Sequence, residues 1–291
     1  MKQVCFLLLL SLMVGQSLFA KVPNRERKAL LALYNDTNGA QWSKPWDLKS
    51  PVSTWYGVTV QNGHVVEINL FRNNLVGTLP EQIGKLEHLT KLNLAFNNIS
   101  GSLPETLVKL EQLKVLKLEM NRLKGELPQD IGRMVQLEEF TGFNNFLSGT
   151  IPSSIGDLQN LRILNISSNN LEGEIPNSLG NLSKLESLGL FENSLDGSIP
   201  SALGRLSRLR ELVLANNELG GDIPMEFSQL ASLQVLQIQN NKFNSFKNLE
   251  MMDSQQFLVF DYDRGPLDKP FKEVDINKTR MADTKFEDGE Q

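Results

Sequence analysis

The residues best suited to acid–base chemistry in this chain are its two histidines, His64 and His88. A catalytic site requires a base, a nucleophile or ion, and groups that converge on one point. The sequence contains no Gly-x-Ser-x-Gly, no His-Glu-x-x-His and no phosphate-binding loop. Each histidine stands close to a predicted strand, where we expect an ordinary surface turn residue. The sequence therefore predicts no enzyme, no metal site and no cofactor.

A second group of residues is suited to recognition. Large apolar side chains that face solvent on a rigid surface are typical of binding interfaces. Phe71, Phe96, Met120 and Phe143 recur at intervals of 23–25 residues, so a repeating structure would place them side by side. With neighbouring charges and one more distant aromatic, the predicted ligand-binding residues are Phe71, Arg72, Phe96, Lys117, Glu119, Met120, Phe143 and Phe191.

A repeat of 24 residues positions these side chains. Its clearest copy, Leu161 to Leu182, follows the pattern L-x-x-L-x-I-x-x-N-x-L-x-G-x-I-P-x-x-L-G-x-L. Glycine and proline recur with the same period and without insertion. This period and pattern form the signature of leucine-rich repeats. We predict a structural role for the asparagine of each repeat, namely Asn73, Asn97, Asn121, Asn145, Asn169, Asn193, Asn217 and Asn241.

Each repeat position has a physical reason. Leu164 and Ile166 alternate with Asn165, as in a strand with one buried face. Asn169 follows where the strand ends, and its amide can both donate and accept hydrogen bonds from backbone groups at the bend. Losing such an amide would leave buried polar groups unpaired, at about 1–3 kcal/mol each. The fifth, seventh and eighth positions of each repeat are predicted to face the concave side.

One repeat departs from the pattern in its core. Gly142 stands where the other repeats carry an inward leucine or isoleucine, and Phe140 replaces the preceding leucine. An empty leucine site would cost several kcal/mol. We therefore expect the ring of Phe140 to fill the vacancy.

The ends of the chain differ from the repeats. An array of stacked repeats leaves an apolar face at each end that a terminal unit must cover. Trp42, Trp46 and Trp55 suit that role better than a stacking platform for sugars or bases. The predicted segments are a secretory signal cleaved near Ala20 (1–20), a helical and tryptophan-rich cap (21–64), repeats with eight strands and seven full units (65–243), a C-terminal cap (244–262) and an acidic, disordered tail (263–291).

Charge and cysteine content narrow the environment. The formal net charge of −5 disfavours a nucleic-acid partner, because phosphate binding needs a basic surface. The apolar run Val4 to Val14 is short for a membrane span, and no later run is long enough. Cys5 is the only cysteine and lies in the predicted signal, so the processed protein would have no disulfide. We expect it to be secreted, or to lie at the cell surface or in a periplasm.

The unit Leu-x-Gly-x-Ile-Pro-x-x-Leu-Gly-x-Leu resembles the plant-type leucine-rich repeat. That subclass occurs in ectodomains of plant receptor-like kinases, in polygalacturonase-inhibiting proteins and in secreted bacterial proteins. The resemblance implies an α/β solenoid, a superhelix with a parallel β-sheet on the concave face and short turns or 3-10 segments on the convex face. Plant members close the N-terminal cap with paired cysteines. Trp55-Tyr-Gly-Val-Thr-Val60 keeps that frame without cysteine, which resembles disulfide-free bacterial relatives.

Together these features predict a non-enzymatic recognition module that binds a protein or peptide through the N-terminal half of its concave face. Two alternatives remain open. Asn69, Asn93 and Asn165 lie near the aromatic residues and could serve a surface glycan. The resemblance to polygalacturonase-inhibiting proteins also admits an inhibitor of an extracellular hydrolase.

Overall fold

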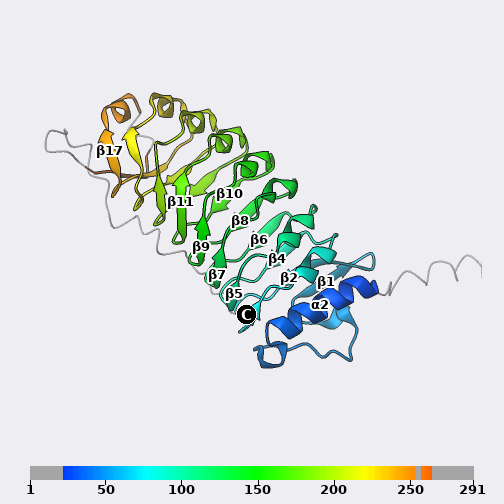
Figure 1. Cartoon of the computed structure of the whole chain (residues 1–291). Helices are drawn as coiled ribbons and strands as arrows, with labels where there is room; N and C mark the ends of the chain where they lie inside the picture. The colour runs from blue at the N-terminus through cyan, green and yellow to red at the C-terminus, as the bar shows by residue number, and fades with distance from the viewer. Residues whose placement is uncertain (1–21, 253–256, 264–291) are drawn as a thin grey trace, which may run out of the picture.

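The computed structural model describes residues 22–252 and 257–263. The predicted signal at 1–20 lies outside these residues, as does nearly all of the predicted tail at 263–291. Each repeat forms one coil, and the coils stack side by side into a curved solenoid (Figure 1). Among the residues that the structure describes, none of the helices combines the length and apolar character that crossing a bilayer requires.

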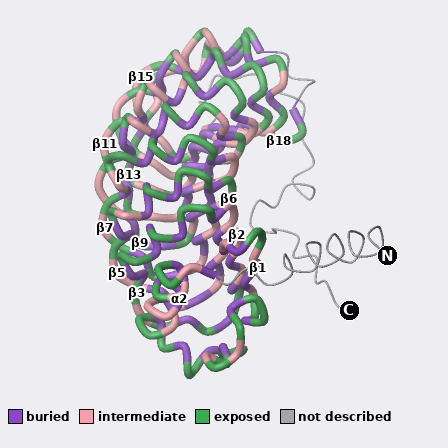
Figure 2. The backbone as a smooth tube through the Cα atoms, turned by 90° about the vertical axis from the view of Figure 1, so that its right-hand side faces the viewer, coloured by how far each residue is buried: buried purple, intermediate pink, exposed green. Residues whose placement is uncertain are grey.

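A sheet that is parallel except at one end lines the inner side of the arc (Figure 2). Consecutive repeats pair in register, so that Leu164 lies between Phe140 and Leu188. Equivalent positions of neighbouring repeats therefore form columns across the sheet. Within the described residues its ten strands are, in spatial order, β1 (Val58–Gln61), β2 (His64–Asn69), β4 (Lys91–Asn93), β6 (Val115–Lys117), β8 (Glu139–Thr141), β10 (Ile163–Asn165), β12 (Ser187–Gly189), β14 (Glu211–Val213), β16 (Val235–Gln237) and β18 (Val259–Asp261).

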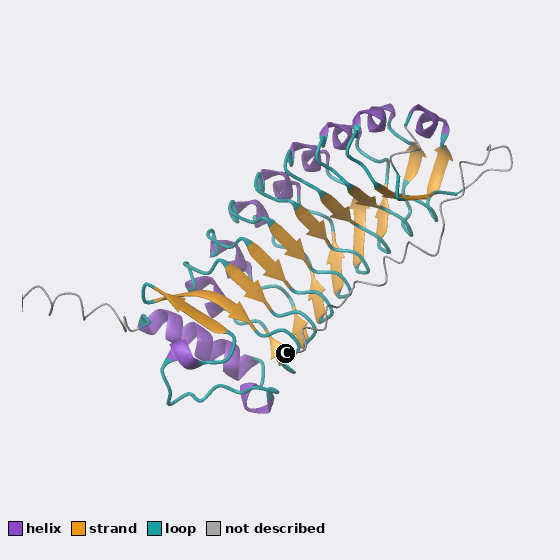
Figure 3. Ribbon diagram, turned by 180° about the vertical axis from the view of Figure 1, so that it is seen from behind, coloured by secondary structure: helices purple, strands orange, loops and turns teal. Residues whose placement is uncertain are grey.

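Shorter elements complete each coil (Figure 3). The Gly-x-Ile-Pro side carries a second parallel ladder, formed by β3 (Val76–Thr78), β5 (Asn98–Gly101), β7 (Arg122–Gly125), β9 (Phe146–Gly149), β11 (Asn170–Glu174) and β13 (Ser194–Asp196), and a pair formed by β15 (Gly220–Asp222) and β17 (Lys242–Ser245). The 3-10 helices of the described chain are η1 (Gly39–Gln41), η2 (Val52–Thr54), η3 (Glu81–Lys85), η4 (Glu105–Lys109), η5 (Ile131–Arg133), η6 (Ser153–Asp157), η7 (Asn177–Asn181), η8 (Ser201–Arg205), η9 (Met225–Gln229) and η10 (Lys247–Met251). The expected leucine-rich-repeat architecture is thus confirmed.

The irregular repeat keeps a filled core. Phe140 is fully buried. A Cβ atom added to Gly142 would meet Cε2 of that ring at 3.4 Å. The ring therefore occupies the space that a leucine takes in other repeats, and the prediction for this pair is confirmed.

The repeat asparagines connect neighbouring coils at the ends of the main strands. Asn97 Oδ1 accepts the N–H groups of Asn73 and Leu75, at 3.0 and 2.9 Å. Its Nδ2 donates to the carbonyl oxygens of Leu70, Leu94 and Ala95. The same pattern of inter-coil bonds recurs along the column to Asn241. Backbone groups that the bend leaves unpaired are thereby satisfied.

The N-terminal end is covered by a helix and aromatic side chains. Helix α2 (Asn24–Asp36) buries one face that includes Ala29, Leu30 and Leu33. Trp42, Trp46 and Trp55 are buried and pack ring against ring, with neighbouring centroids 4.9 and 4.7 Å apart. These tryptophans are core residues here, so they offer no exposed platform for stacking a ligand.

Strands outside the repeats extend the main sheet at both ends. β1 pairs with β2 in the antiparallel direction. At the other end β18 continues the parallel pairing after β16. Beyond β18, Asp263 Oδ2 lies 3.4 Å from the N–H of Asn241 and takes the place that the next asparagine would hold. The eight strands expected from the repeats are therefore flanked by one strand from each end segment.

Candidate functional site

The inner face of the main sheet presents one side of every strand. In β10, Ile163 and Asn165 are half-buried while Leu164 between them has no exposed surface. The third repeat position therefore faces outward together with the fifth. The sequence prediction included the column of fifth positions and left out the column of third positions. The alternation of buried and exposed residues that placed Asn165 outward also predicts an outward third position. In the first four strands this column holds Glu67, Lys91, Val115 and Glu139.

The predicted apolar residues lie on neighbouring coils in the N-terminal half of this face. The rings of Phe71 and Phe96 are in contact, with centroids 5.2 Å apart and a tilt of 60°. Phe71 is 40 % exposed, and Phe96, Met120 and Phe143 are half-buried. The N–H of Met120 donates to the carbonyl oxygen of Phe143 at 2.9 Å, so these two residues are also adjacent. We call Phe71, Phe96, Met120 and Phe143 the apolar stripe.

The eighth repeat position has an unusual backbone. All eight residues of this column have φ between 49° and 58°, in the left-handed region. Asparagine tolerates this conformation, whereas bulky side chains do so at a cost of roughly 1–3 kcal/mol. Asn144, Asn216 and Asn240 conform to that preference, but Phe96 and Met120 do not. Two members of the apolar stripe therefore occupy positions that the backbone disfavours for them.

Two of the predicted charged residues are engaged within the face. Lys117 Nζ lies 2.7 Å from Glu139 Oε1 on the next strand. Glu119 Oε2 accepts a hydrogen bond from the hydroxyl of Thr141 at 2.6 Å. Glu119 is only 8 % exposed, and this burial raises the pKa of its carboxyl group above the ordinary value of 4.5. The expectation that Glu119 is open to solvent is wrong, because it is buried beside the neighbouring coil. Its role as a ligand contact stays a prediction.

The remaining predicted residues lie outside the apolar stripe. Arg72 is exposed at the first coil, and Phe191 is half-buried beyond β10. The asparagines considered for glycan binding are Asn69, Asn93 and Asn165. Each ends its strand, and its amide oxygen accepts the N–H of the residue two positions onward. Sequence reasoning also missed Phe146, which is 58 % exposed on β9, outside the main sheet. Its position after a repeat asparagine is usually polar, and that contrast was the available signal.

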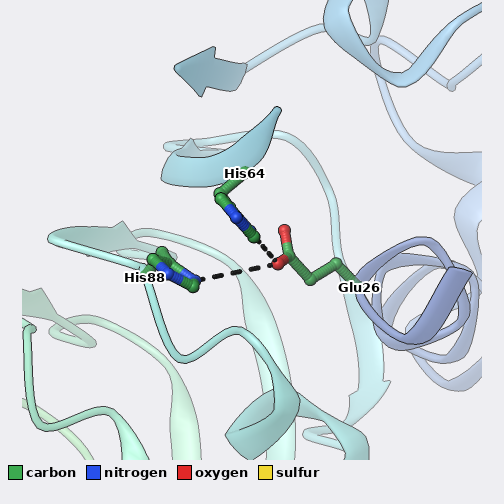
Figure 4. A group of neighbouring side chains, drawn as sticks. All are labelled: Glu26, His64 and His88. Carbon is green, nitrogen blue, oxygen red and sulfur yellow. Dashed lines mark hydrogen bonds and ion pairs between the residues drawn. The ribbon is translucent and has the colours of Figure 1, made fainter. Parts of the chain in front are cut away.

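The two histidines lie together, which their interpretation as ordinary surface turn residues did not include. The rings of His64 and His88 stack with centroids 3.7 Å apart. Both face the carboxylate of Glu26 from helix α2 (Figure 4). Glu26 was not singled out from the sequence, although it shares its helical face with Leu30 and Leu33.

Solved plant receptor ectodomains share the stacked-coil fold of this chain. The leucine-rich-repeat ectodomain of the receptor kinase GASSHO1/SCHENGEN3 from Arabidopsis thaliana, in complex with CASPARIAN STRIP INTEGRITY FACTOR 2, has a TM-score of 0.76 and 32 % identity over 81 % of this chain and 29 % of that one. The ectodomain of the Arabidopsis receptor kinase HAESA, in complex with an IDA peptide hormone, has a TM-score of 0.70 and 30 % sequence identity. The match covers 82 % of this chain and 42 % of that one. HAESA in complex with IDA and the co-receptor SERK1 has a TM-score of 0.71 and 31 % sequence identity, over 83 % of this chain and 41 % of that one. The chain spans less than half the length of each.

Sequence families give a consistent assignment. No curated protein matches the chain. The family described as a leucine-rich repeat region matches residues 69–196 and 142–258, which together cover most of the stacked coils and β16. On this match and on the geometry of its repeats, the chain belongs to the leucine-rich-repeat family.

Proposed function

We propose that this protein is an extracellular, non-enzymatic recognition module that binds a peptide or an extended protein segment across the apolar stripe. The observation that carries the proposal is the backbone cost at Phe96 and Met120, both in the left-handed region. Strain of this kind persists where the surrounding structure enforces it, and it clusters at functional sites. A ligand that covers these side chains would recover the cost by burying apolar surface.

The spacing of the strands suits an extended ligand. Neighbouring strands lie about 4.8 Å apart, so the four strands from β2 to β8 span about 15 Å. An extended peptide of about five residues has the same length. The main-chain groups inside the sheet are already paired with neighbouring strands. Side-chain contacts to the apolar stripe and to Arg72 would therefore provide most of the affinity.

The solved neighbours support the same class of ligand. GASSHO1/SCHENGEN3 and HAESA were each solved with a peptide or protein factor bound to the ectodomain. Because this chain spans less than half of those ectodomains, the identity of their ligands does not transfer to it. What transfers to the proposal is only that a leucine-rich-repeat ectodomain can bind a peptide.

The proposal is tested by changing aromatic side chains one at a time. A ligand would be captured by crosslinking to the full chain in the medium of the producing cells, and its affinity measured by surface plasmon resonance. Phe96→Ala and Phe143→Ala should each weaken binding by about tenfold or more, as expected for central apolar contacts. Phe146→Ala is the matched control, because it removes an exposed aromatic ring from a different face of the coil.

The two sets of variants distinguish the site from the fold. Circular dichroism should show that all three variants keep the folded array. Equal affinity of wild type, Phe96→Ala and Phe143→Ala would contradict the proposed site. A loss of affinity in Phe146→Ala alone would move the binding surface to the side of the solenoid.

Extracellular placement is part of the same proposal. It rests on the apolar run near the N-terminus, which resembles a secretory signal, and on the receptor ectodomains among the solved neighbours. Mass spectrometry of the protein recovered from the medium should show an N-terminus near Lys21. A protein that stays inside the cell with its first twenty residues still attached would contradict the extracellular placement.

A further inference from the structure

Three potential metal ligands meet where the N-terminal cap joins the first two repeats. Glu26 comes from helix α2, His64 begins β2, and His88 precedes β4. His64 Nδ1 lies 2.6 Å from Glu26 Oε1, and His88 Nδ1 lies 3.9 Å from the same oxygen. Figure 4 shows both rings directed at this carboxylate. Three segments that are distant in sequence thus converge on one point.

The burial of Glu26 calls for a positive partner. Its side chain has no exposed surface, and a buried carboxylate is unfavourable unless its charge is compensated. Oε2 accepts the N–H of Val65 at 2.8 Å, which fixes the carboxylate and leaves Oε1 facing the histidines. The nearest arginine in sequence, Arg25, forms an ion pair with Glu87 at 3.1 Å. The compensation at Oε1 therefore falls to the two imidazole rings or to an ion between them.

We propose that Glu26, His64 and His88 bind a divalent transition-metal ion, with zinc as the preferred ion. Candidate ligand atoms of the three residues all lie within 4.8 Å of one another. Zinc bonds of about 2.0–2.2 Å place ligand atoms about 3.4 Å apart in tetrahedral geometry. The present distances of 2.6 and 3.9 Å reach that value with shifts below about 1 Å. Two imidazole nitrogens with one carboxylate suit zinc, whereas magnesium and calcium prefer oxygen ligands.

The surroundings leave room for a fourth ligand. The histidines border a recess of about 450 Å³ that Gln61 and Gln112 also line. The side chains of His64 and His88 are 31 % and 46 % exposed, so an ion can reach them from solvent. Water then completes the coordination. A ring nitrogen that binds the ion must be unprotonated, so each ring that bound through Nδ1 would carry its proton on Nε2.

The ion would act as a clamp between the cap and the repeats. In leucine-rich repeats with paired cysteines, a disulfide closes this end of the array. The described residues contain no cysteine. A metal bound by α2, by the start of β2 and by the turn before β4 would join the same parts. Ligand binding that is specific to the folded state adds to stability by mass action.

Zinc binding to the full chain tests this inference directly. The protein would be prepared without a histidine tag, treated with EDTA and titrated with zinc sulfate by isothermal calorimetry. We expect one zinc per chain and a rise in Tm of about 5–10 °C at a hundredfold excess over Kd. Magnesium should give neither heat nor a shift. Cobalt in place of zinc should give the visible absorption bands of a tetrahedral site with nitrogen and oxygen ligands.

One variant removes a ligand with little damage to the fold. His88→Ala should weaken zinc binding at least about tenfold and keep the Tm measured in EDTA, because the ring is partly exposed. Glu87→Gln is the matched control, since it changes the adjacent residue and leaves the three ligands in place. Absence of zinc binding, absence of the cobalt bands, or equal zinc affinity in wild type and His88→Ala would each overturn the inference. Binding without a rise in Tm would overturn the clamp.

Discussion

The two halves of the concave face share one backbone and differ in the side chains that it carries. The eighth repeat position is left-handed in every coil, with φ of 56° at Met120 and 58° at Asn216. In the C-terminal half this column holds Ser168, Glu192, Asn216 and Asn240, so two of its four residues suit the conformation. In the N-terminal half it holds Arg72, Phe96, Met120 and Asn144. Because the backbone is the same in both halves, its conformation does not account for Phe96 and Met120. The proposed recognition site would account for them.

The largest expected effect is a loss of stability on changing the repeat asparagines, which both halves of the solenoid share. Asn121 is buried and bonds the neighbouring coil through Ile99 N–H and the Leu94 carbonyl group. Asn121→Ala should lower the free energy of unfolding by about 3 kcal/mol, since several buried backbone groups lose their partner. Asn193→Ala, in the more exposed part of the column, should cost about 1–2 kcal/mol, because water can replace part of the amide.

Urea denaturation of both asparagine variants checks this ranking. Binding to the apolar stripe should survive in both as long as the array is folded. Equal stability of wild type and Asn121→Ala would show that the column does not hold the coils together. A greater loss in Asn193→Ala would reverse the order that burial predicts.

The next effect is expected from a substitution that gives the N-terminal half an asparagine found in the C-terminal half. Met120→Asn should raise the free energy of unfolding by about 1 kcal/mol, because asparagine tolerates the left-handed backbone. It would face Asn144 as Asn216 faces Asn240, where the two amides are hydrogen-bonded at 2.7 Å. The same variant should bind ligand more weakly. Thermal and urea unfolding, together with affinity, measure the two opposite changes.

The reverse exchange completes the test. Asn216→Met should destabilise the protein by about 1 kcal/mol without changing the apolar stripe. If Met120→Asn is no more stable than wild type and also binds equally well, the two halves do not differ in the way proposed here.

The smallest effect is a change in pH dependence. Burial raises the pKa of Glu119 in the folded state, so its favourable contribution is complete below the ordinary value of 4.5 and is lost as pH rises through the folded pKa. Glu119→Gln should therefore be more stable than wild type at about pH 7, and the difference should shrink toward about pH 4. Urea midpoints across this range measure it. Glu192→Gln removes the same charge at an exposed site and controls for net charge; a difference that stays constant with pH would contradict the prediction.

The fold was predictable because the pattern of apolar residues recurs in every repeat. Alternating apolar residues fixed the buried face of each strand, and the 24-residue period fixed the register between neighbouring strands. Even the irregular repeat followed from volume, since Phe140 had to occupy the space next to Gly142. In each case a local rule acts on residues that lie close in sequence or in the same column.

The candidate site was only partly predictable, because the burial and partners of its residues come from contacts between coils. Nothing near Glu119 in the sequence shows that Thr141 covers its carboxylate, because this contact joins two coils. The meeting of Glu26 with His64 and His88 likewise depends on how helix α2 packs against the repeats. The left-handed backbone of Phe96 and Met120 has no signal in those residues themselves. It could have been inferred from the asparagines that occupy the same position in other repeats.

The antiparallel strand β1 has a consequence for assembly. A parallel sheet of identical coils is a template to which a further coil can always add, so the stack resembles a growing polymer. β1 reverses direction at the N-terminal edge, and helix α2 lies over the coil beside it. An incoming coil of another molecule would therefore not find there the parallel edge and exposed core of a regular coil. The end segments thus set the length of the array, and insertion or deletion of whole 24-residue units between them would change the breadth of the concave face without a change of fold.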